Sequence, residues 1–204
     1  CTLILAKNVE FMICDNLRGK NIREVAFTRI HFTNVGAAIL ALRNMLLYSP
    51  QVKSLVWSEI PIDSVDDMAL FTQMLSDRPV EELNFVLNGD GNAQALLEGA
   101  DLSKYKRLRL RGNNLRTNGR ADIPDLIASN SPLESLDLSS NNLNNDDAVL
   151  IAESLSRNTH LKNIILLYNN DKIQERGKNA LLRALKDTSS MNALSDSNHT
   201  CNIA

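Results

Sequence analysis

Three arginines alternate with two leucines in the stretch YKRLRLRGNNL, residues 105–115. Side chains of a β-strand point to its two faces in turn, so Arg107, Arg109 and Arg111 would share one face. Leu108 and Leu110 would then point to the other face, toward a core. Arginine is a favoured anchor residue in protein interfaces. The spacing therefore indicates a recognition surface for another protein.

A second interpretation is a solvated strand face on which the arginines are partly paired with Glu82 and Asp137 of the flanking strands, where Arg109 and Asp137 could touch. Exposed ion pairs of this kind contribute only about 0–1 kcal/mol each. Three like charges on one strand repel one another, which favours the binding interpretation. Both interpretations place the arginines outside the core.

Residues that could catalyse a reaction are not grouped along the chain. The histidines His31, His160 and His199 fall in different segments, and no recognised motif places a serine or cysteine beside a base. The glycines of LNGDGN (87–92) are too few and wrongly spaced to bind a nucleotide. The stretch NNLNNDD (141–147) is explained more simply as a turn and helix cap than as a calcium loop. We therefore expect no enzyme, no metal site and no cofactor.

The cysteines Cys1, Cys14 and Cys201 are odd in number and widely spaced. This matches neither a disulfide framework nor a zinc site and favours a reducing compartment such as the cytoplasm. Asn198-His199-Thr200 is a glycosylation sequon, but such triplets are frequent by chance. The chain begins with Cys1 rather than methionine, and we expect it to be part of a longer chain.

Charge and hydropathy limit the classes of partner. The 204 residues carry 22 Lys and Arg against 24 Asp and Glu, a net charge of −2. No overall field would attract nucleic acid or an anionic membrane. No apolar run has the length of a membrane span, and no signal peptide is recognisable. A protein partner remains as the expected class.

The arginine stretch is one copy of a repeat. Residues 133–143 (LESLDLSSNNL) and 161–171 (LKNIILLYNND) follow it at steps of 28 residues without a gap. The first, fourth and sixth positions of each copy are apolar or aromatic, and the ninth is asparagine. Weaker copies begin at residues 22, 52, 80 and 191. The seven block starts are therefore residues 22, 52, 80, 105, 133, 161 and 191. A period of this length predicts stacked structural units.

Helical periodicity follows the blocks, which predicts one strand and one helix per unit. Predicted helices cover residues 35–47, 64–76, 146–156 and 175–187, with Ser64 and Asp146 as N-caps. Pro124 would shorten the helix after the arginine block. Strands joined through helices run parallel.

This pattern resembles the leucine-rich repeat, and the period near 28 is similar to its ribonuclease-inhibitor-like subtype. The resemblance implies an α/β horseshoe of about seven repeats, with parallel strands on the concave face and helices on the convex face. The repeats would span residues 22–190, after an N-terminal helical cap or partial repeat at 1–21 and before a C-terminal edge strand or cap at 191–204. It also implies that a ladder of asparagines bonds to neighbouring turns: Asn88, Asn113, Asn141 and Asn169.

Further expectations concern single residues that depart from the repeat pattern or occupy special positions in it. Ile30 and Ile60 stand where the ladder asparagine belongs, so those turns must satisfy their backbone differently. Asp196 points inward on the expected last strand, where a charge guards a sheet edge. Trp57 is expected in the core with a partner for its N–H. Cys201 is expected to be a small buried residue.

The concave face would then present a basic ridge, acidic flanks and an apolar patch. We expect a non-enzymatic scaffold that binds a protein partner there, through Arg107, Arg109, Arg111, Asp137, Ile165, Leu167 and Tyr168. One alternative is a regulator resembling the repeat-built GTPase-activating protein of the GTPase Ran. Another is a recognition segment of a larger receptor or effector.

Overall fold

The computed structural model describes residues 22–78, 80–116, 120–156, 158–169, 172–186 and 197–204, together with the backbone of 2–5. These residues form a single parallel sheet of eight strands whose spatial order is the order in the sequence. The strands are β1 (Thr2–Leu5), β2 (Glu24–Thr28), β3 (Ser54–Ser58), β4 (Glu82–Val86), β5 (Arg107–Arg109), β6 (Ser135–Asp137), β7 (Asn163–Ile165) and β8 (Asn202–Ile203).

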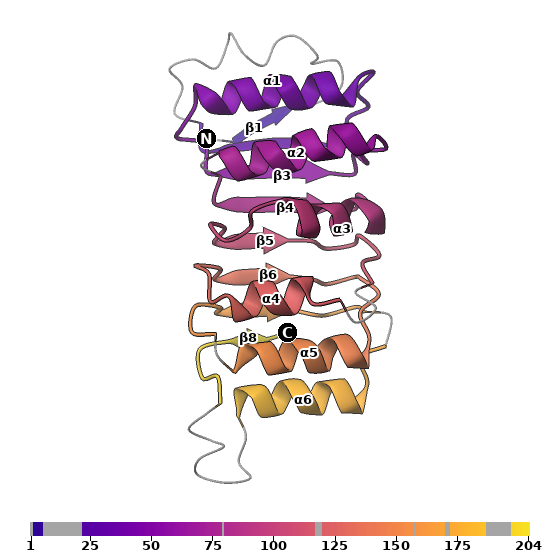
Figure 1. Ribbon diagram of the computed structural model, residues 1–204, viewed down its shortest axis with the longest axis vertical. Helices are drawn as coiled ribbons and strands as arrows, with labels where there is room; N and C mark the ends of the chain where they lie inside the picture. Colours follow the sequence, from indigo (N-terminus) through magenta and orange to yellow (C-terminus); the bar gives the residue numbers. More distant parts are fainter. Residues whose placement is uncertain are drawn as a thin grey trace.

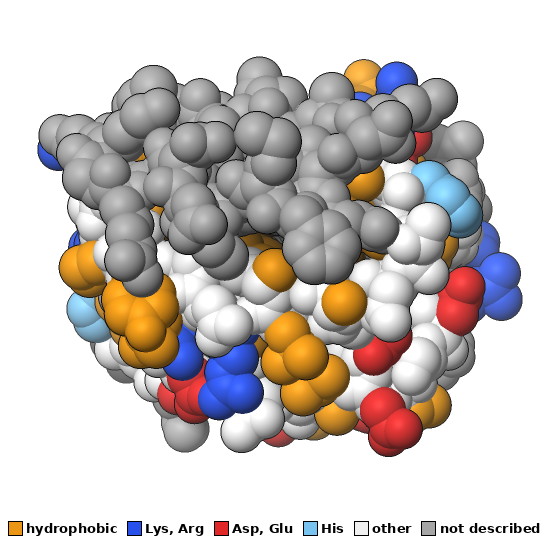
Figure 2. Space-filling view, turned by 90° about the horizontal axis from the view of Figure 1, so that it is seen from above, with side chains coloured by type: hydrophobic (Ala, Val, Ile, Leu, Met, Phe, Trp, Pro, Cys, Tyr) orange, Lys and Arg blue, Asp and Glu red, His pale blue; other side chains and the backbone are white. Residues whose placement is uncertain are grey.

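One helix follows each strand from β2 to β7, and the helices lie along one side of the sheet (Figure 1). They are α1 (Val35–Leu47), α2 (Val65–Asp77), α3 (Asp90–Gly99), α4 (Asp122–Ala128), α5 (Asn145–Leu155) and α6 (Glu175–Leu185). Each unit contacts its neighbours in sequence, which gives a solenoid-like stack. Seen from its N-terminal end, the described apolar, acidic and basic side chains are interspersed (Figure 2).

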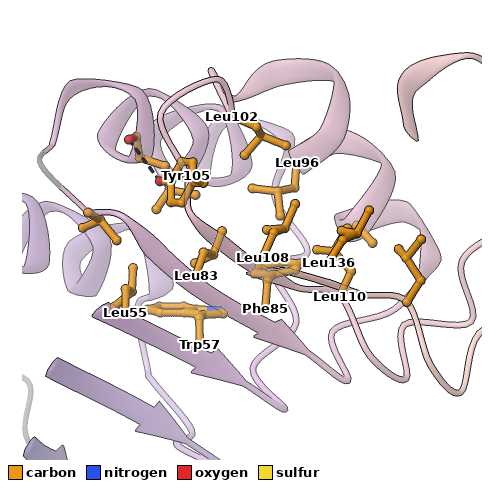
Figure 3. Packing of buried hydrophobic residues seen from close by; sticks show 14 of the residues in the cluster. Leu55, Trp57, Leu83, Phe85, Leu96, Leu102, Tyr105, Leu108, Leu110 and Leu136 are labelled. Atoms are coloured by element: carbon orange, nitrogen blue, oxygen red, sulfur yellow. Dashed lines mark hydrogen bonds between the residues drawn. The ribbon is translucent and has the colours of Figure 1, made fainter. Parts of the chain in front are cut away.

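The core lies between the sheet and the helices. It is built from the fourth and sixth positions of each block, which point from the strands toward the helix layer (Figure 3). These side chains are all buried: Val25, Phe27, Leu55, Trp57, Leu83, Phe85, Leu108, Leu110, Leu136, Leu138, Ile164 and Leu166. The predicted core positions are therefore confirmed on all six strands from β2 to β7, although Ala26, Ser54 and Ser58 of the other face are buried as well.

Aromatic side chains pack against one another in the N-terminal half of the core. The Trp57 ring lies 5.5 Å from that of Phe27, 5.8 Å from that of Phe32 and 5.0 Å from that of Phe71, between centroids. Its indole Nε1 donates to the Ile60 carbonyl at 2.8 Å. Trp57 is thus a core residue with a satisfied N–H, as predicted.

The helices α1, α2 and α5 begin at polar residues whose side chains cap them. Ser64 accepts a bond from the Asp67 N–H at 3.3 Å and caps α2 as predicted. The prediction of Asp146 as a cap is wrong by two residues. Asn144 caps α5, and the Asp147 carboxylate returns a bond to the Asn144 N–H at 2.8 Å. This reciprocal arrangement satisfies two backbone donors that a single Asp146 cap would leave open.

Buried asparagines join successive units at the ends of the strands. Asn88 Oδ1 accepts the Ile60 N–H at 2.8 Å, and its Nδ2 donates to the Trp57 carbonyl at 2.9 Å. The unit that lacks an asparagine at Ile60 is therefore satisfied by the next unit. Asn113, Asn141 and Asn169 bond to the preceding turn in the same way.

Asn141 makes the largest set of these bonds. Its Oδ1 accepts the N–H groups of Asn113 and Leu115, both at 3.0 Å. Its Nδ2 donates to the carbonyls of Leu110 at 3.0 Å and Leu138 at 2.9 Å. One buried amide thus satisfies four main-chain groups across two units.

Asn141→Ala is expected to lower the free energy of unfolding by about 3–5 kcal/mol, because each buried group left unpaired costs about 1–3 kcal/mol. Urea unfolding followed by circular dichroism measures the change. Asn163→Ala, at an exposed position of β7, is the control and should cost less than about 0.5 kcal/mol. Equal losses for the two variants would contradict the structural role of the ladder.

The N-terminal segment differs from the helix expected there. Residues 2–5 form the strand β1, which pairs with β2 in the register Thr2 with Glu24 and Leu5 with Phe27. The hydrogen-bonding edge of β2 is therefore covered by a strand, which a helix could not have done. Residues 6–21 lie outside the described part of the chain.

The C-terminal strand also differs from its expected position. The strand that pairs with β7 is Asn202–Ile203, after the part of the 191–201 block that was expected to form it. Asp196, the expected edge guard, lies outside the described residues. Asn198 supplies the reason for the shift: its Nδ2 donates to the carbonyls of Leu155 at 2.8 Å and Asn158 at 2.7 Å. These bonds bury the amide of the glycosylation sequon in the fold.

Cys201 and Tyr105 are buried groups that titrate. Cys201 is buried as expected, although just before β8, and its burial raises the pKa of the thiol to about 11. Tyr105 is fully buried, and its hydroxyl donates to the Leu75 carbonyl at 3.2 Å (Figure 3). Burial and, to a lesser degree, the Asp101 carboxylate raise the pKa of this phenol.

Because the phenol pKa is raised in the folded state, there is an alkaline pH range in which the phenol is protonated in the folded state but deprotonated in the unfolded state. The stability contributed by Tyr105 is therefore complete below about pH 10 and falls above it. Relative to Tyr105→Phe, wild type should be about 1 kcal/mol more stable at pH 8 through its hydrogen bond. That advantage should shrink above pH 10 by up to about 1.4 kcal/mol per pH unit.

Urea unfolding at a series of alkaline pH values measures this difference. Tyr168→Phe is the matched control, because the Tyr168 side chain is exposed and should leave the alkaline slope unchanged. A wild-type advantage over Tyr105→Phe that stays constant with pH would contradict the assignment.

Candidate functional site

The face of the sheet turned away from the helices, here called the open face, carries the residues between the core positions. Strand register places them in rows. The middle row reads Ala26, Val56, Asn84, Arg109, Asp137 and Ile165 across β2 to β7. Arg107 lies between Glu82 and Ser135 in the row before it. The rows bring together side chains that are 25–30 residues apart in sequence.

The arginines of β5 turn toward β4. Arg107 forms an ion pair with Glu82 through Nη1 and Oε1. Arg109 Nη1 donates to the Asn84 amide oxygen at 3.0 Å. The expected pair of Arg109 with Asp137 is not formed, although the two residues are register partners. Of the two carboxylates expected to pair with the arginines, Glu82 does so and Asp137 does not.

Asp137 is occupied by its own turn. Its Oδ1 accepts the Ser139 N–H at 2.9 Å and the Ser139 hydroxyl at 2.6 Å. These bonds are local and cost little chain entropy, so they win over a bond to the long side chain of Arg109. Asp137 therefore stabilises the end of β6 and leaves the guanidinium beside it without a carboxylate partner.

Two cationic side chains of the ridge thus have no acidic partner among the described residues. Arg109 meets only a neutral amide, and the exposed Arg111 has no side-chain bond there. Glu81, near the start of β4, is shared by Lys106 at 2.7 Å and Lys53 at 3.1 Å. Hydrogen bonds from Lys106 and then Lys53 lower the pKa of Glu81. That carboxylate is therefore already engaged.

An apolar patch lies two strands from the ridge, at a spacing of about 4.8 Å per strand. Ile165 is half-buried on β7, whereas the side chains of Leu167 and Tyr168 are 48% and 76% exposed. Leu167 and Tyr168 follow the end of β7, in the turn. A hollow of about 240 Å³ adjoins them, with Ile203 and Leu181 in its lining. The patch is thus continuous with an apolar depression.

The turn after each strand has the same unusual backbone. The eighth position of every block from 22 to 161 has a left-handed conformation, with φ between 54° and 70°. The residues are Arg29, Glu59, Leu87, Gly112, Ser140 and Tyr168. From Arg29 to Ser140, each N–H donates to the seventh-position carbonyl of the next unit, as Leu87 does to Arg111. This column forms the rim of the open face and fixes the direction in which its side chains leave the turn.

Sequence reasoning missed Leu87. Its side chain is 50% exposed and lies over the backbone of Gly112, beside Arg111. Leu87 has the same block position as Tyr168, and that shared eighth position is the signal that would have identified it. The ridge therefore has an exposed apolar side chain next to it as well as two strands away.

Groups that could do chemistry are not assembled in the described residues. His160 Nδ1 lies 3.0 Å from Asn130 Oδ1 in a loop, and His31 is exposed in a loop near the other end of the stack. Within the same residues no cluster of three or more histidine, cysteine or acidic side chains could hold a metal ion. No described helix is both long enough and apolar enough to traverse a bilayer.

No protein-family model and no curated protein matches the sequence. Among solved structures, the chain is similar to a Bacteroides fragilis protein determined by a structural genomics consortium, with a TM-score of 0.38 and 11% identity. The match covers 74% of this chain and 60% of that one, so this chain spans less than two thirds of its length. A likeness at this level shows no common family.

Gly112→Ala is expected to destabilise the fold by about 1–3 kcal/mol. A Cβ at this residue, whose φ is 70°, would lie 2.6 Å from the Leu87 Cδ2 atom. Thermal unfolding measures the loss, and adding Leu87→Ala should recover the part due to the clash. Gly91→Ala, which has open space and lies in α3, is the control and should raise stability by about 0.5–1 kcal/mol. A neutral Gly112→Ala would contradict the geometry of the rim.

Proposed function

We propose that this chain is a leucine-rich repeat solenoid of the ribonuclease-inhibitor-like subtype that binds a protein partner and catalyses no reaction. The repeating strand and helix, the parallel sheet and the asparagine bonds between units support the repeat type. In that architecture the open face is the concave surface and the helices form the convex one. We place the protein in the cytoplasm, in keeping with its few, widely spaced cysteines.

The observation that carries the proposal is the incomplete compensation of the arginine ridge. Arg107 has a carboxylate partner, but Arg109 and Arg111 have none among the described residues. They stand beside the exposed Leu87 and two strands from Leu167 and Tyr168. Arginine and aromatic side chains next to apolar surface are the usual anchors of protein interfaces. A partner with a carboxylate and an apolar contact side chain would complement this face.

The scaffold also suits recognition because its side chains are held before a partner arrives. The rim residues have fixed backbone directions, and the Arg109 side chain is oriented by Asn84 at 3.0 Å. Side chains that are already ordered lose less entropy on binding. The open face would therefore bind with little rearrangement.

Affinity capture from cells of the source organism tests the proposal with three baits. These are wild type, Arg109→Glu/Arg111→Glu, and Arg183→Glu/Lys186→Glu, which makes the same charge change on and beside α6. A partner should be held by wild type and by the α6 variant and lost by the ridge variant. The loss should exceed roughly tenfold in Kd, because two favourable contacts become repulsive.

Circular dichroism and urea unfolding first establish that all three baits are folded. Equal capture of every protein by the three baits would contradict binding through the ridge. A partner lost only from the α6 variant would place recognition on the helix side instead.

A further inference from the structure

A groove of about 660 Å³ runs between α2 and α3. These two helices belong to the layer on the side of the sheet opposite the open face (Figure 1). The α2 wall includes Val65, Met68 and Thr72, and the α3 wall includes Gly91 and Ala95. Val65 is 84% exposed at the lip, whereas Met68 is buried at the floor. The groove thus presents apolar surface that neighbouring helices do not cover.

Small residues four positions apart create this hollow. Gly91, Ala95 and Gly99 occupy one side of α3 at successive turns, facing α2. A Cβ added to Gly91 would meet no atom within 4 Å. Gly177 in α6 is the opposite case, because a Cβ there would lie 2.9 Å from the Ala148 Cβ. A small residue thus brings α6 close to α5, and Gly99 of α3 lies close to Thr72 of α2, whereas Gly91 leaves space.

The polar atoms in and around the floor are already satisfied. The Thr72 hydroxyl donates to the Ala69 carbonyl at 3.0 Å, and Asn92 Nδ2 donates to the Asn88 carbonyl at 2.9 Å. The Asn88 side chain is bonded to Ile60 and Trp57 as part of the ladder. With these groups bonded within the fold and Met68 buried at the floor, the floor suits an apolar side chain.

The charges at the groove have one sign. Asp63 and Glu98 are the charged residues of its lining, and both are exposed. Gly99 lies beside Thr72, nine residues after Asp63, so the two carboxylates stand near opposite ends of the groove. The helical part of this interval, from Val65 to Thr72, rises about 10.5 Å at 1.5 Å per residue, about two helical turns. Glu98 is oriented by the Gln94 amide at 2.8 Å.

We propose that this groove is a second docking site, which binds a basic amphipathic helix of a partner protein. A bulky apolar side chain of that helix fills the space over Gly91 and Ala95. Two Lys or Arg residues about two turns apart on the same helix face Asp63 and Glu98. The site is independent of the arginine ridge, which lies on the other side of the sheet and attracts the opposite charge.

The test is a selection from a displayed library of random peptides about fifteen residues long, four helical turns, on the whole chain. Selected peptides are then measured by fluorescence anisotropy against wild type and variants. Gly91→Leu fills the groove without strain and places a helix-favouring residue in α3. Gln73→Leu, at an exposed α2 position outside the groove, is its matched control.

Glu98→Lys reverses one carboxylate, and Glu153→Lys makes the same charge change on α5. Arg109→Glu/Arg111→Glu separates this site from the open face. Selected peptides are expected to carry basic residues flanking an apolar one. Their Kd should rise at least roughly tenfold with Gly91→Leu and severalfold with Glu98→Lys. The two helix controls and the ridge variant should leave it unchanged.

The proposal is overturned if no peptide is enriched, if the enriched peptides are not basic, or if Gly91→Leu binds them as wild type does. Light scattering of the free protein tests whether a second copy of this chain occupies the groove instead. A dimer that Gly91→Leu converts to monomer would show that a second copy of this chain fills the groove, and would also overturn the proposal. Loss of peptide binding in the ridge variant alone would assign the peptides to the open face.

Discussion

The rest of the structure depends on hydrogen bonds to the main-chain groups at the end of each strand. There the chain leaves the sheet for a helix, and its N–H and carbonyl groups are buried without ladder partners. A buried asparagine of the next unit supplies both a donor and an acceptor, as Asn88 does for Ile60 and Trp57. Because each turn is completed by its neighbour, one unit cannot form a satisfied core alone.

Because each turn depends on its neighbour, the strand register is fixed, whereas the residues on the surfaces can vary. Asn113 and Asn141 hold adjacent turns in line, so residues at equal block positions stand side by side on the open face. Their identities can vary without disturbing the core, since the fourth and sixth positions are the strand residues that point toward the helices. The helix layer can vary more than the sheet, because the distance between neighbouring helices depends on helix length and side-chain size. The short α3 unit, with Gly91 and Ala95 toward α2, leaves a groove between these two helices.

The periodic part of the fold could be predicted from sequence, and its ends could not. Alternation identified the core residues of β2 to β7, because each strand repeats the same environment. At the ends this environment is missing on one side, so local patterns mislead. Residues 2–5 form a strand where a helix was expected, and the last strand follows the buried Asn198 rather than the repeat period. Asn198 lies 40 residues after its partner Asn158, so a fixed period near 28 cannot find it.

The candidate site was predictable in composition but not in pairing. Periodicity places Arg109 and Asp137 side by side, but it cannot show that Asp137 prefers the N–H and hydroxyl of Ser139. Short-range bonds of this kind form at little entropic cost and remove a carboxylate from the face. The same competition explains why three arginines can be tolerated on one strand face. Glu82 neutralises Arg107, Asn84 orients Arg109 without cancelling its charge, and Arg111 extends beyond the strand. The stack thus holds positive charge in a fixed position, and a partner's carboxylates would meet it without first displacing an internal one.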